Sequence, residues 1–280
     1  MGARQTTTSV KLPATVQRFD IHQRIQHGSL AISVILLVLS GWPLSTQGVG
    51  ASKVLVDLFG GLESCGSIHR GAALLLIFGS VYHLFYLIGL GTRRKLRLTM
   101  LPTPADVRDL VQNISYMLGM SKDRPRFPRY TYFEKFDYWA VFWGVVIMVG
   151  SGLVRWFPVK ATAVLPTWAY EIAHYAHADE ALLATLAIFI WHFYNVHLRP
   201  AVFPMSKVFL HGRLTIDELA HEHRAEYDEL VAKLEREQRA ETTRDEEQDE
   251  EKNDEKDEEK SDEQDDEQNE EPSDKSEKRE

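Results

Sequence analysis

The stretch AHYAHADEALLATLAIFIWHFYNVHLRP, residues 173–200, decides how this chain folds. Its middle is an apolar run, and about 20 such residues are enough for a helix to cross a lipid bilayer. The same stretch carries His174, His177, His192 and His197. Imidazoles are costly in the hydrocarbon core, and ionisable residues found there usually serve a function. The stretch therefore predicts a membrane-spanning helix whose histidines take part in the chemistry of the protein.

Three other apolar runs accompany the one inside this stretch. The four runs are Gly28–Leu44, Gly71–Leu90, Tyr138–Val154 and Ala181–Val196. Aromatic residues at the ends of the two shorter runs extend them into the membrane interface. We therefore expect an all-α membrane protein built as a four-helix transmembrane bundle.

Basic residues predict the direction in which the chain crosses the membrane. The segment between the second and third runs, residues 91–129, holds nine lysines and arginines, whereas residues 45–68 hold only Lys53. Short loops rich in lysine and arginine stay on the cytoplasmic side. We expect a multi-pass protein of the inner (cytoplasmic) membrane with its N and C termini in the cytoplasm.

The C-terminal segment accounts for the net charge of −9. From Glu241 to Glu280 there are 22 acidic and seven basic residues, without an aliphatic or aromatic side chain. Such a segment cannot bury enough apolar surface to fold, which predicts disorder. Before it, Thr215 and Glu218 have the spacing of a capping box, which predicts an amphipathic helix. The expected parts are an N-terminal cytoplasmic tail (1–17), a transmembrane domain (18–210), a cytoplasmic helix (211–240) and a disordered acidic tail (241–280).

Histidines recur at matching spacing in two of the runs. His69 and His83 are 14 residues apart, and His177 and His192 are 15 residues apart, both close to four helical turns. In the predicted direction, the first member of each pair lies near the outer face. The second lies near the inner face, where His27 begins the first run. Because neutral imidazole ligates iron and bundle cores host such sites, we expect non-covalent b-type haem.

A single cysteine, Cys65, limits the other redox centres. An iron–sulfur cluster is usually held by four thiolates, and c-type haem attachment needs a CxxCH motif, which the sequence lacks. The chain has no centre of its own for oxidising a substrate, and we expect no nucleic-acid partner. Substrate chemistry is therefore assigned to another subunit.

Two short stretches resemble each other. LSGWPL ends the first run, and GSGLVRWFP ends the third. Both lie near the outer face in the predicted topology. We interpret them as a shared way of ending a helix rather than as an internal repeat.

The order of these features resembles a known family, the four-helix di-haem cytochrome b subunits of the formate dehydrogenase gamma and nickel–iron hydrogenase type. The resemblance covers roughly residues 18–232. It implies two haem b groups, with His69 and His177 ligating the outer one and His27 and His192 the inner one. The segments that carry it are RFDIHQRIQHGSLAISVILLVLSG, SIHRGAALLLIFGSVYHLFYL, RYTYFEKFDYWAVFWGVVIMVGSGLVRWFP, HADEALLATLAIFIWHFYNVHLRPAVFPM and ELAHEHRAEYDEL.

The chain departs from this pattern in two ways. The family spaces the two ligands of its fourth span by 14 residues, whereas His177 and His192 are 15 apart. His83 has no counterpart in the formate dehydrogenase subunits, and it would fit the cytochrome b of quinol–cytochrome c reductases, where two helices supply all four ligands. Either His27 or His83 therefore completes the inner site. A third haem held by His83 and His197 is a further alternative.

The family binds quinone beside its inner haem, at the cytoplasmic start of the third span. The matching segment is RYTYFEKFDYW, in which Thr131, Glu134 and Lys135 are candidate contacts to the quinone oxygen and candidate proton carriers. Thr131 stands where the family has an asparagine. The quinone would be menaquinone or ubiquinone.

The resemblance implies a membrane-anchoring electron-transfer subunit of a larger respiratory-chain oxidoreductase. It would connect an iron–sulfur or multihaem c-type subunit on the outer, periplasmic face with the quinone pool. Beyond that subunit, the quinone and membrane lipid, no partner is expected. An intramembrane metal-dependent enzyme and a proton-coupled transporter that uses the histidine cluster stay open as alternatives. The lack of an HExxH motif counts against the enzyme, and the lack of a clear inverted repeat counts against the transporter.

Overall fold

The structure is a computed structural model that describes residues 11–200 and 202–269. The chain forms two compact units, one of Pro13–Glu226 and one that combines Met1–Leu12 with Tyr227–Glu280. Residues 1–10 of the predicted N-terminal tail and residues 270–280 of the predicted acidic tail lie outside the described residues. The site discussed below belongs entirely to the first unit.

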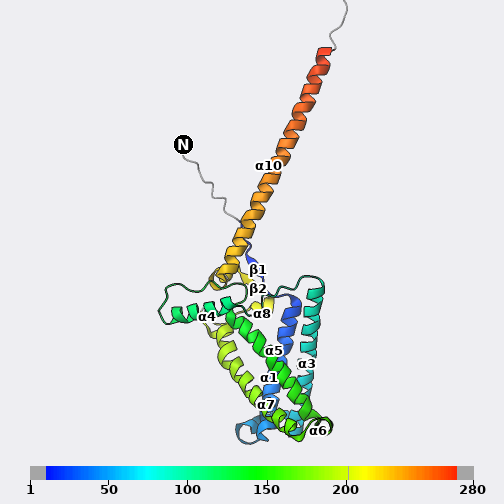
Figure 1. Ribbon diagram of the computed structural model, residues 1–280, viewed down its shortest axis with the longest axis vertical. Coiled ribbons are helices and arrows are strands. Elements are labelled where there is room, and N and C mark those ends of the chain that lie inside the picture. Colours follow the sequence, from blue (N-terminus) through cyan, green and yellow to red (C-terminus); the bar gives the residue numbers. More distant parts are fainter. Residues whose placement is uncertain (1–10, 201, 270–280) are drawn as a thin grey trace, which may run out of the picture. The chain divides into compact units, whose positions relative to one another are not determined.

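Four helices long and apolar enough to cross a membrane form the first unit, which confirms the expected all-α membrane bundle (Figure 1). They are α1 (Ile21–Thr46), α3 (Leu62–Thr92), α5 (Tyr132–Trp156) and a fourth span, Thr167–Leu198. The fourth span consists of α7 (Thr167–Leu186) followed by the π-helical turns η2 (Ala187–His192) and η3 (Tyr194–Leu198). Helix α1 packs mainly against α3, and α5 against α7.

Short elements lie at the two ends of the bundle (Figure 1). At the end where α1 and α5 finish lie η1 (Gly50–Ser52), α2 (Lys53–Phe59) and α6 (Pro158–Val164). At the opposite end lie β1 (Thr15–Gln17), α4 (Pro104–Met117), α8 (Val208–His211), β2 (Arg213–Thr215) and α9 (Ile216–Glu222). The two strands pair antiparallel, with Val16 opposite Leu214. This pairing joins the segment before the first span to the segment after the last one.

Polar caps fix where the helices at this end begin. Thr215 accepts a hydrogen bond from the Glu218 backbone nitrogen at 3.2 Å, and the Glu218 carboxylate accepts one from the Thr215 nitrogen at 2.8 Å. The predicted capping box is therefore confirmed. Asp20 and Gln23 cap α1 in the same reciprocal way. A cap satisfies backbone donors that a helix start leaves unpaired, so these residues set the register of the spans.

The π-helical turns of the fourth span affect its histidines. In a regular α-helix, 15 residues make about 4.2 turns. A π-helical turn bonds i to i+5 and so holds roughly one residue more than an α-helical turn. The turn at Ala187–His192 therefore rotates His192 back toward the face that carries His177. The departure from a 14-residue spacing is absorbed in this way.

Helix α10 (Arg224–Asn269) extends through much of the segment for which the sequence predicts disorder. The structure is helical where we expected irregular chain between Glu241 and Asn269. The physical reason is local composition, because this part has neither glycine nor proline and is rich in glutamate, lysine, glutamine and arginine, which are good helix formers. Its side chains from Arg239 to Glu250 are exposed, so no apolar core supports the helix there.

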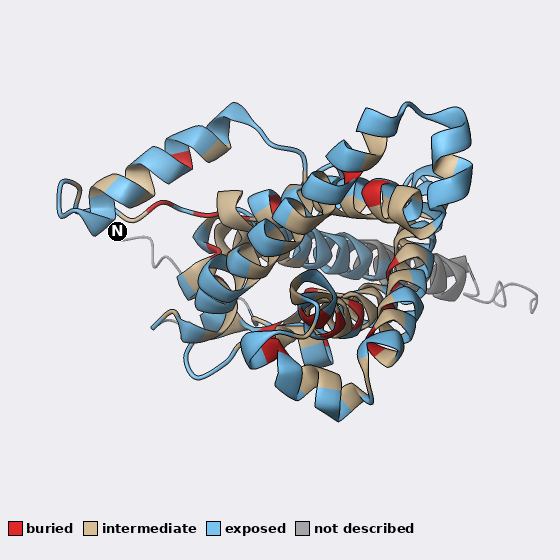
Figure 2. Cartoon of the chain, turned by 90° about the horizontal axis from the view of Figure 1, so that it is seen from below, coloured by how far each residue is buried: buried red, intermediate tan, exposed pale blue. Residues whose placement is uncertain are grey.

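Buried positions in the bundle are mostly small residues (Figure 2). Ser33, Ser40 and Cys65 are fully buried, and Ala72 and Ala173 nearly so. Large apolar side chains of the spans point outward, as they do when the surrounding solvent is lipid. Small residues between membrane helices let the backbones approach closely and leave room beside them for larger groups.

Candidate functional site

Two histidines from different helices face each other near the end of the bundle where α3 begins. His69 lies in the second turn of α3, and His177 lies in the middle of α7. The centres of their rings are 6.3 Å apart. The structure thus brings together the two residues that the sequence analysis assigned to the outer site.

A serine holds each of these imidazoles in one orientation. Ser40 of α1 lies 3.1 Å from His69 Nδ1, and Ser151 of α5 lies 3.0 Å from His177 Nδ1. Each serine hydroxyl donates its proton to the backbone carbonyl four residues earlier, at 2.6 Å in both cases. The hydroxyl oxygen can then only accept from the imidazole, which places the proton on Nδ1. Nε2 of each histidine is left with a free lone pair, the form that binds a metal.

A glycine follows each serine and lies against the same ring. A Cβ atom on Gly41 would lie 3.1 Å from His69 Cε1, and one on Gly152 would lie 3.2 Å from His177 Cε1. The similar stretches LSGWPL and GSGLVRWFP therefore do more than end two helices. Each supplies a serine that orients a histidine and a glycine that makes room for it.

A second pair of histidines lies toward the other end of the bundle. His27 of α1 and His192 of η2 have ring centres 6.5 Å apart. Asp137 of α5 lies 3.1 Å from His192 Nδ1. A carboxylate accepts this hydrogen bond, so His192 also carries its proton on Nδ1 and has a free lone pair on Nε2.

The spacing of both pairs fits a shared metal ion. Bonds between a metal ion and an imidazole nitrogen are about 2.0–2.1 Å long, so two rings that face each other across one ion have centres roughly 6–6.5 Å apart. The observed 6.3 and 6.5 Å agree with this value. Neutral imidazoles whose other nitrogen is held by a serine or carboxylate are the donor set that an axially ligated haem iron requires.

His83 is arranged differently from these four histidines. Its Nδ1 lies 2.8 Å from Gln26 Oε1, and its Nε2 lies 3.1 Å from the Tyr138 hydroxyl. The amide oxygen accepts the Nδ1 proton, so the tyrosine hydroxyl donates to Nε2. Both ring nitrogens of His83 therefore have partners within the protein.

His174 and His197 complete the set in the opening stretch. The His174 ring packs edge-on against the neighbouring Tyr175. His197 packs against Phe193 and Phe209, and its Nδ1 is buried without a hydrogen bond. Neither ring stands opposite another histidine in the way that the two pairs do.

The candidate quinone residues serve the start of α5. Thr131 and Glu134 form a reciprocal capping box, with the Glu134 carboxylate 2.8 Å from the Thr131 nitrogen. Lys135 is buried and pairs with both carboxylate oxygens of Asp106 at 2.8 and 2.9 Å. These contacts lower the pKa of Asp106 against the opposing effect of burial. The polar atoms of all three residues are engaged in holding the helix.

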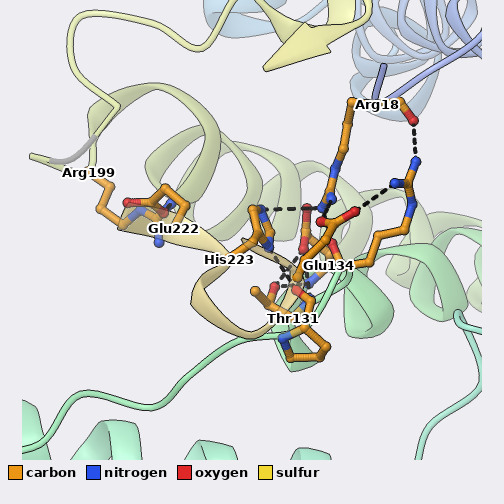
Figure 3. Close-up of polar contacts among 9 residues, drawn as sticks. Arg18, Thr131, Glu134, Arg199, Glu222 and His223 are labelled. Carbon is orange, nitrogen blue, oxygen red and sulfur yellow. Dashed lines mark hydrogen bonds and ion pairs between the residues drawn. The ribbon is translucent and has the colours of Figure 1, made fainter. Parts of the chain in front are cut away.

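Arg18 joins distant parts of the chain at this end of the bundle (Figure 3). It is only 4% exposed. Its guanidinium pairs with Glu226 at 2.7 Å and with Glu134 at 3.5 Å, and it donates to the backbone oxygen of Arg129. Arg129 in turn pairs with Glu226 at 2.7 Å. The segment before α1, the start of α5 and the start of α10 are thereby locked together.

His223 is a neutral member of the same network (Figure 3). Its Nδ1 donates to the Pro128 carbonyl at 2.8 Å, and its Nε2 lies 3.3 Å from an Arg18 nitrogen. Burial, and next the charge of Arg18, lower the pKa of His223. The imidazole therefore accepts a hydrogen bond from the guanidinium while uncharged.

A four-helix membrane bundle with facing imidazole pairs between its helices has the architecture of a membrane-bound b-type cytochrome. Such a protein transfers electrons by means of haem. A model of the prokaryotic cytochrome b561 family matches residues 18–203, and the chain belongs to this family. The family recognised from the sequence is thereby confirmed. A comparison with curated proteins gives no match.

Proposed function

We propose that this chain is a di-haem, membrane-anchoring subunit that carries electrons between a redox partner on the outer face and the quinone pool. The observation that carries the proposal is the presence of two histidine pairs, with ring centres 6.3 and 6.5 Å apart. Each haem, when bound, supplies a one-electron redox centre. The protein supplies the ligands, their orientation and a bundle that crosses the membrane.

In this proposal His69 and His177 hold the outer haem. The support is the matched arrangement around them, in which Ser40 and Ser151 fix the tautomer from opposite sides. Hydrogen bonds of this kind to ligating histidines keep the ring in position and raise its basicity. The pairing also uses one helix from each of the packed pairs α1–α3 and α5–α7.

We assign His27, rather than His83, as the partner of His192 at the inner haem. His27 stands opposite His192 at a distance that suits a shared iron. Both nitrogens of His83 are already hydrogen-bonded, to Gln26 and Tyr138. The latter arrangement leaves no lone pair for a metal, and it argues equally against a third haem that would use His83.

The proposed topology follows from the basic loop. With residues 91–129 in the cytoplasm, His69 and His177 lie toward the periplasm, and His27 and His192 toward the cytoplasm. Both chain termini are then cytoplasmic. An iron–sulfur or multihaem c-type subunit would meet the periplasmic end, where the outer haem lies.

Quinone exchange is proposed at the cytoplasmic start of α5, beside the inner pair. Asp137, one turn into this helix, contacts His192 and so connects the segment with the inner site. Thr131, Glu134 and Lys135 keep a positioning role here, because their polar atoms cap α5 and hold Asp106. Menaquinone and ubiquinone both have the carbonyl oxygens that such a site would bind.

Two alternative functions are less well supported. Among the residues that the structure describes, no group of three or more histidine, cysteine, aspartate or glutamate side chains is arranged to hold a metal ion. A proton relay through the histidines gains no support from His69, His177 and His192, each of which is oriented toward a facing histidine. Membership of a cytochrome family favours electron transfer over both.

Single histidine substitutions test this assignment. Haem content and the reduced-minus-oxidised spectrum should be recorded for H27A, H83A and H69A in membranes that are supplied with excess haem. We expect H27A and H69A each to lose one of two haems, and H83A to keep both. Retention of both haems by H27A, together with loss of one by H83A, would reverse the inner assignment. The rate at which each variant oxidises a water-soluble quinol then tests the link to the quinone pool.

A further inference from the structure

Helix α4 (Pro104–Met117) presents its polar side to the protein. Asp106 pairs with the buried Lys135 of α5, and Asn113 donates to the Tyr132 hydroxyl at 3.0 Å. Asp109, on the same strip of the helix, is only 8% exposed. Three polar residues at positions i, i+3 and i+7 therefore form the face by which α4 is attached.

The opposite side of α4 is apolar and uncovered in the monomer. Val107 is 63% exposed, Val111 57%, Ile114 47% and Leu118, just after the helix, 69%. Positions i, i+4, i+7 and i+11 form one continuous strip. A surface helix in water has the reverse arrangement, with apolar residues inward and polar residues outward. The exposed strip of α4 therefore fits an apolar environment outside the protein.

The place of α4 in the unit suggests which environment this is. It lies at the end of the bundle where α3 finishes and α5 begins, and it runs across the direction of the spans (Figure 1). Seen along the bundle, it extends to one side of the four spans rather than over their ends (Figure 2). The apolar strip is thus continuous with the part of the protein that is surrounded by lipid.

Exposed cations accompany the helix. Arg93, Arg94, Lys95 and Arg97 precede α4 and are all exposed. The side chain of Arg108, on the helix itself, is 77% exposed. The acidic residues of α4 are held against the protein, so the free charge of this surface is positive. Amphipathic helices with such a charge bind the interface of membranes that contain anionic lipids.

We propose that α4 and the preceding segment Arg93–Arg97 form a binding surface for anionic phospholipid. The strip Val107, Val111, Ile114 and Leu118 enters the boundary between headgroups and acyl chains. The cations of residues 93–97 bind the phosphate groups above it. The paired Asp106 and Lys135 then anchor α5, and with it Asp137 and the inner histidine pair, to the membrane surface.

Spin labels on the two sides of α4 test where the helix lies. The full chain carrying V107C or A105C is labelled with a nitroxide and reconstituted in nanodiscs of phosphatidylcholine and phosphatidylglycerol. Both positions are exposed and lie on opposite sides of the helix, and the unsubstituted chain, with its buried Cys65, reports background labelling. We expect the ratio of oxygen accessibility to that of a water-soluble nickel chelate to be at least about fivefold higher at position 107 than at position 105, as for a side chain below the headgroups. Equal, water-like ratios at both positions would overturn the proposal. So would shielding of position 107 from both reagents, which indicates a second copy of the chain.

Lipid selectivity tests the basic segment. Spin-labelled phosphatidylglycerol and phosphatidylcholine report, by the fraction of immobilised lipid, how strongly each associates with the protein. We expect the native chain to prefer phosphatidylglycerol and R93Q/R94Q/K95Q/R97Q to lose at least about fivefold of this preference. The matched control K233Q/R236Q/R239Q/R244Q removes the same charge from exposed positions of α10 and should keep the preference. An equal loss in both variants would refute a site at residues 93–97, and an unchanged haem spectrum shows that each variant is folded.

Discussion

Replacing Ser40 and Ser151 by alanine should weaken the outer haem site while leaving the inner one intact. Each serine is the acceptor for one Nδ1 proton, at 3.1 Å from His69 and 3.0 Å from His177. Without the serine, the imidazole can turn or change its tautomer, and Nε2 is no longer held toward the iron.

The magnitude follows from the two hydrogen bonds. One net hydrogen bond contributes about 1 kcal/mol, and loss of a partner that orients a metal ligand lowers metal affinity by about 10- to 100-fold. We expect each single variant, S40A or S151A, to lose about tenfold in affinity for the outer haem. The double variant should lose about 100-fold, because the serines act on different ligands of the same site.

The rate of haem transfer to an excess of apo-globin measures this loss. The detergent-solubilised protein should release one haem faster in the variants, and the second at the native rate. S33A is the matched control, because Ser33 is equally buried and bonds the Leu30 carbonyl in the same helix as Ser40. If S40A/S151A released haem no faster than S33A, the assigned role of the serines would be wrong. Faster loss of both haems would indicate general loosening of the bundle.

Three further variants test the network that joins the ends of the chain. R18A removes a buried charge that pairs with Glu226 and should destabilise the protein by about 3 kcal/mol in thermal unfolding, whereas R108A, at an exposed pair, should change stability by less than about 0.5 kcal/mol. An R18A melting temperature equal to that of R108A would contradict the network. His223 has a lowered pKa in the folded protein, so its contribution to stability is complete above the ordinary imidazole pKa of about 6.5 and is lost as the pH falls below that value. H223Q should remove this part of the acid destabilisation, and an unchanged pH profile of the melting temperature would refute it. G212A should cost about 1–2 kcal/mol, because Gly212 has a φ of +75° and lies against the Phe19 backbone oxygen, and a native melting temperature would show that strand β2 adjusts freely.

The spans and the histidine pairs could be predicted because their signals are local. Apolar runs of sufficient length define the helices, and equal spacing in two of them places histidines at two depths. The family pattern then paired His69 with His177 and His27 with His192. The structure places the same side chains opposite each other, although haem binding by these residues stays a proposal.

The environment of the histidines could not be predicted to the same extent. Ser40–Gly41 and Ser151–Gly152 were visible as similar stretches, but only packing between helices shows that they contact imidazoles. The choice between His27 and His83 likewise depends on side-chain partners from other helices. A signal was available for the serines, since two similar Ser–Gly pairs at the same depth as two histidines suggest a shared role.

Long-range polar contacts were the least accessible part. Arg18 and Glu226 are 208 residues apart in the sequence, and no local pattern indicates that they form an ion pair. Thr131 and Glu134 have capping-box spacing, yet the sequence analysis interpreted them only as quinone contacts. The helical course of residues 241–269 shows the opposite limit, because local helix propensity there outweighs the lack of a core.

Haem quantitation with low-temperature electron paramagnetic resonance on the purified full chain tests the central proposal most directly. Two histidine pairs at iron-bridging distance predict two b-type haems per chain, each with the low-spin signal of an iron held by two imidazoles. Substitution of His69 should abolish one signal, and substitution of His27 the other. A single haem per chain, or a high-spin signal from either site in the native protein, would contradict the assignment of four histidines as axial ligands.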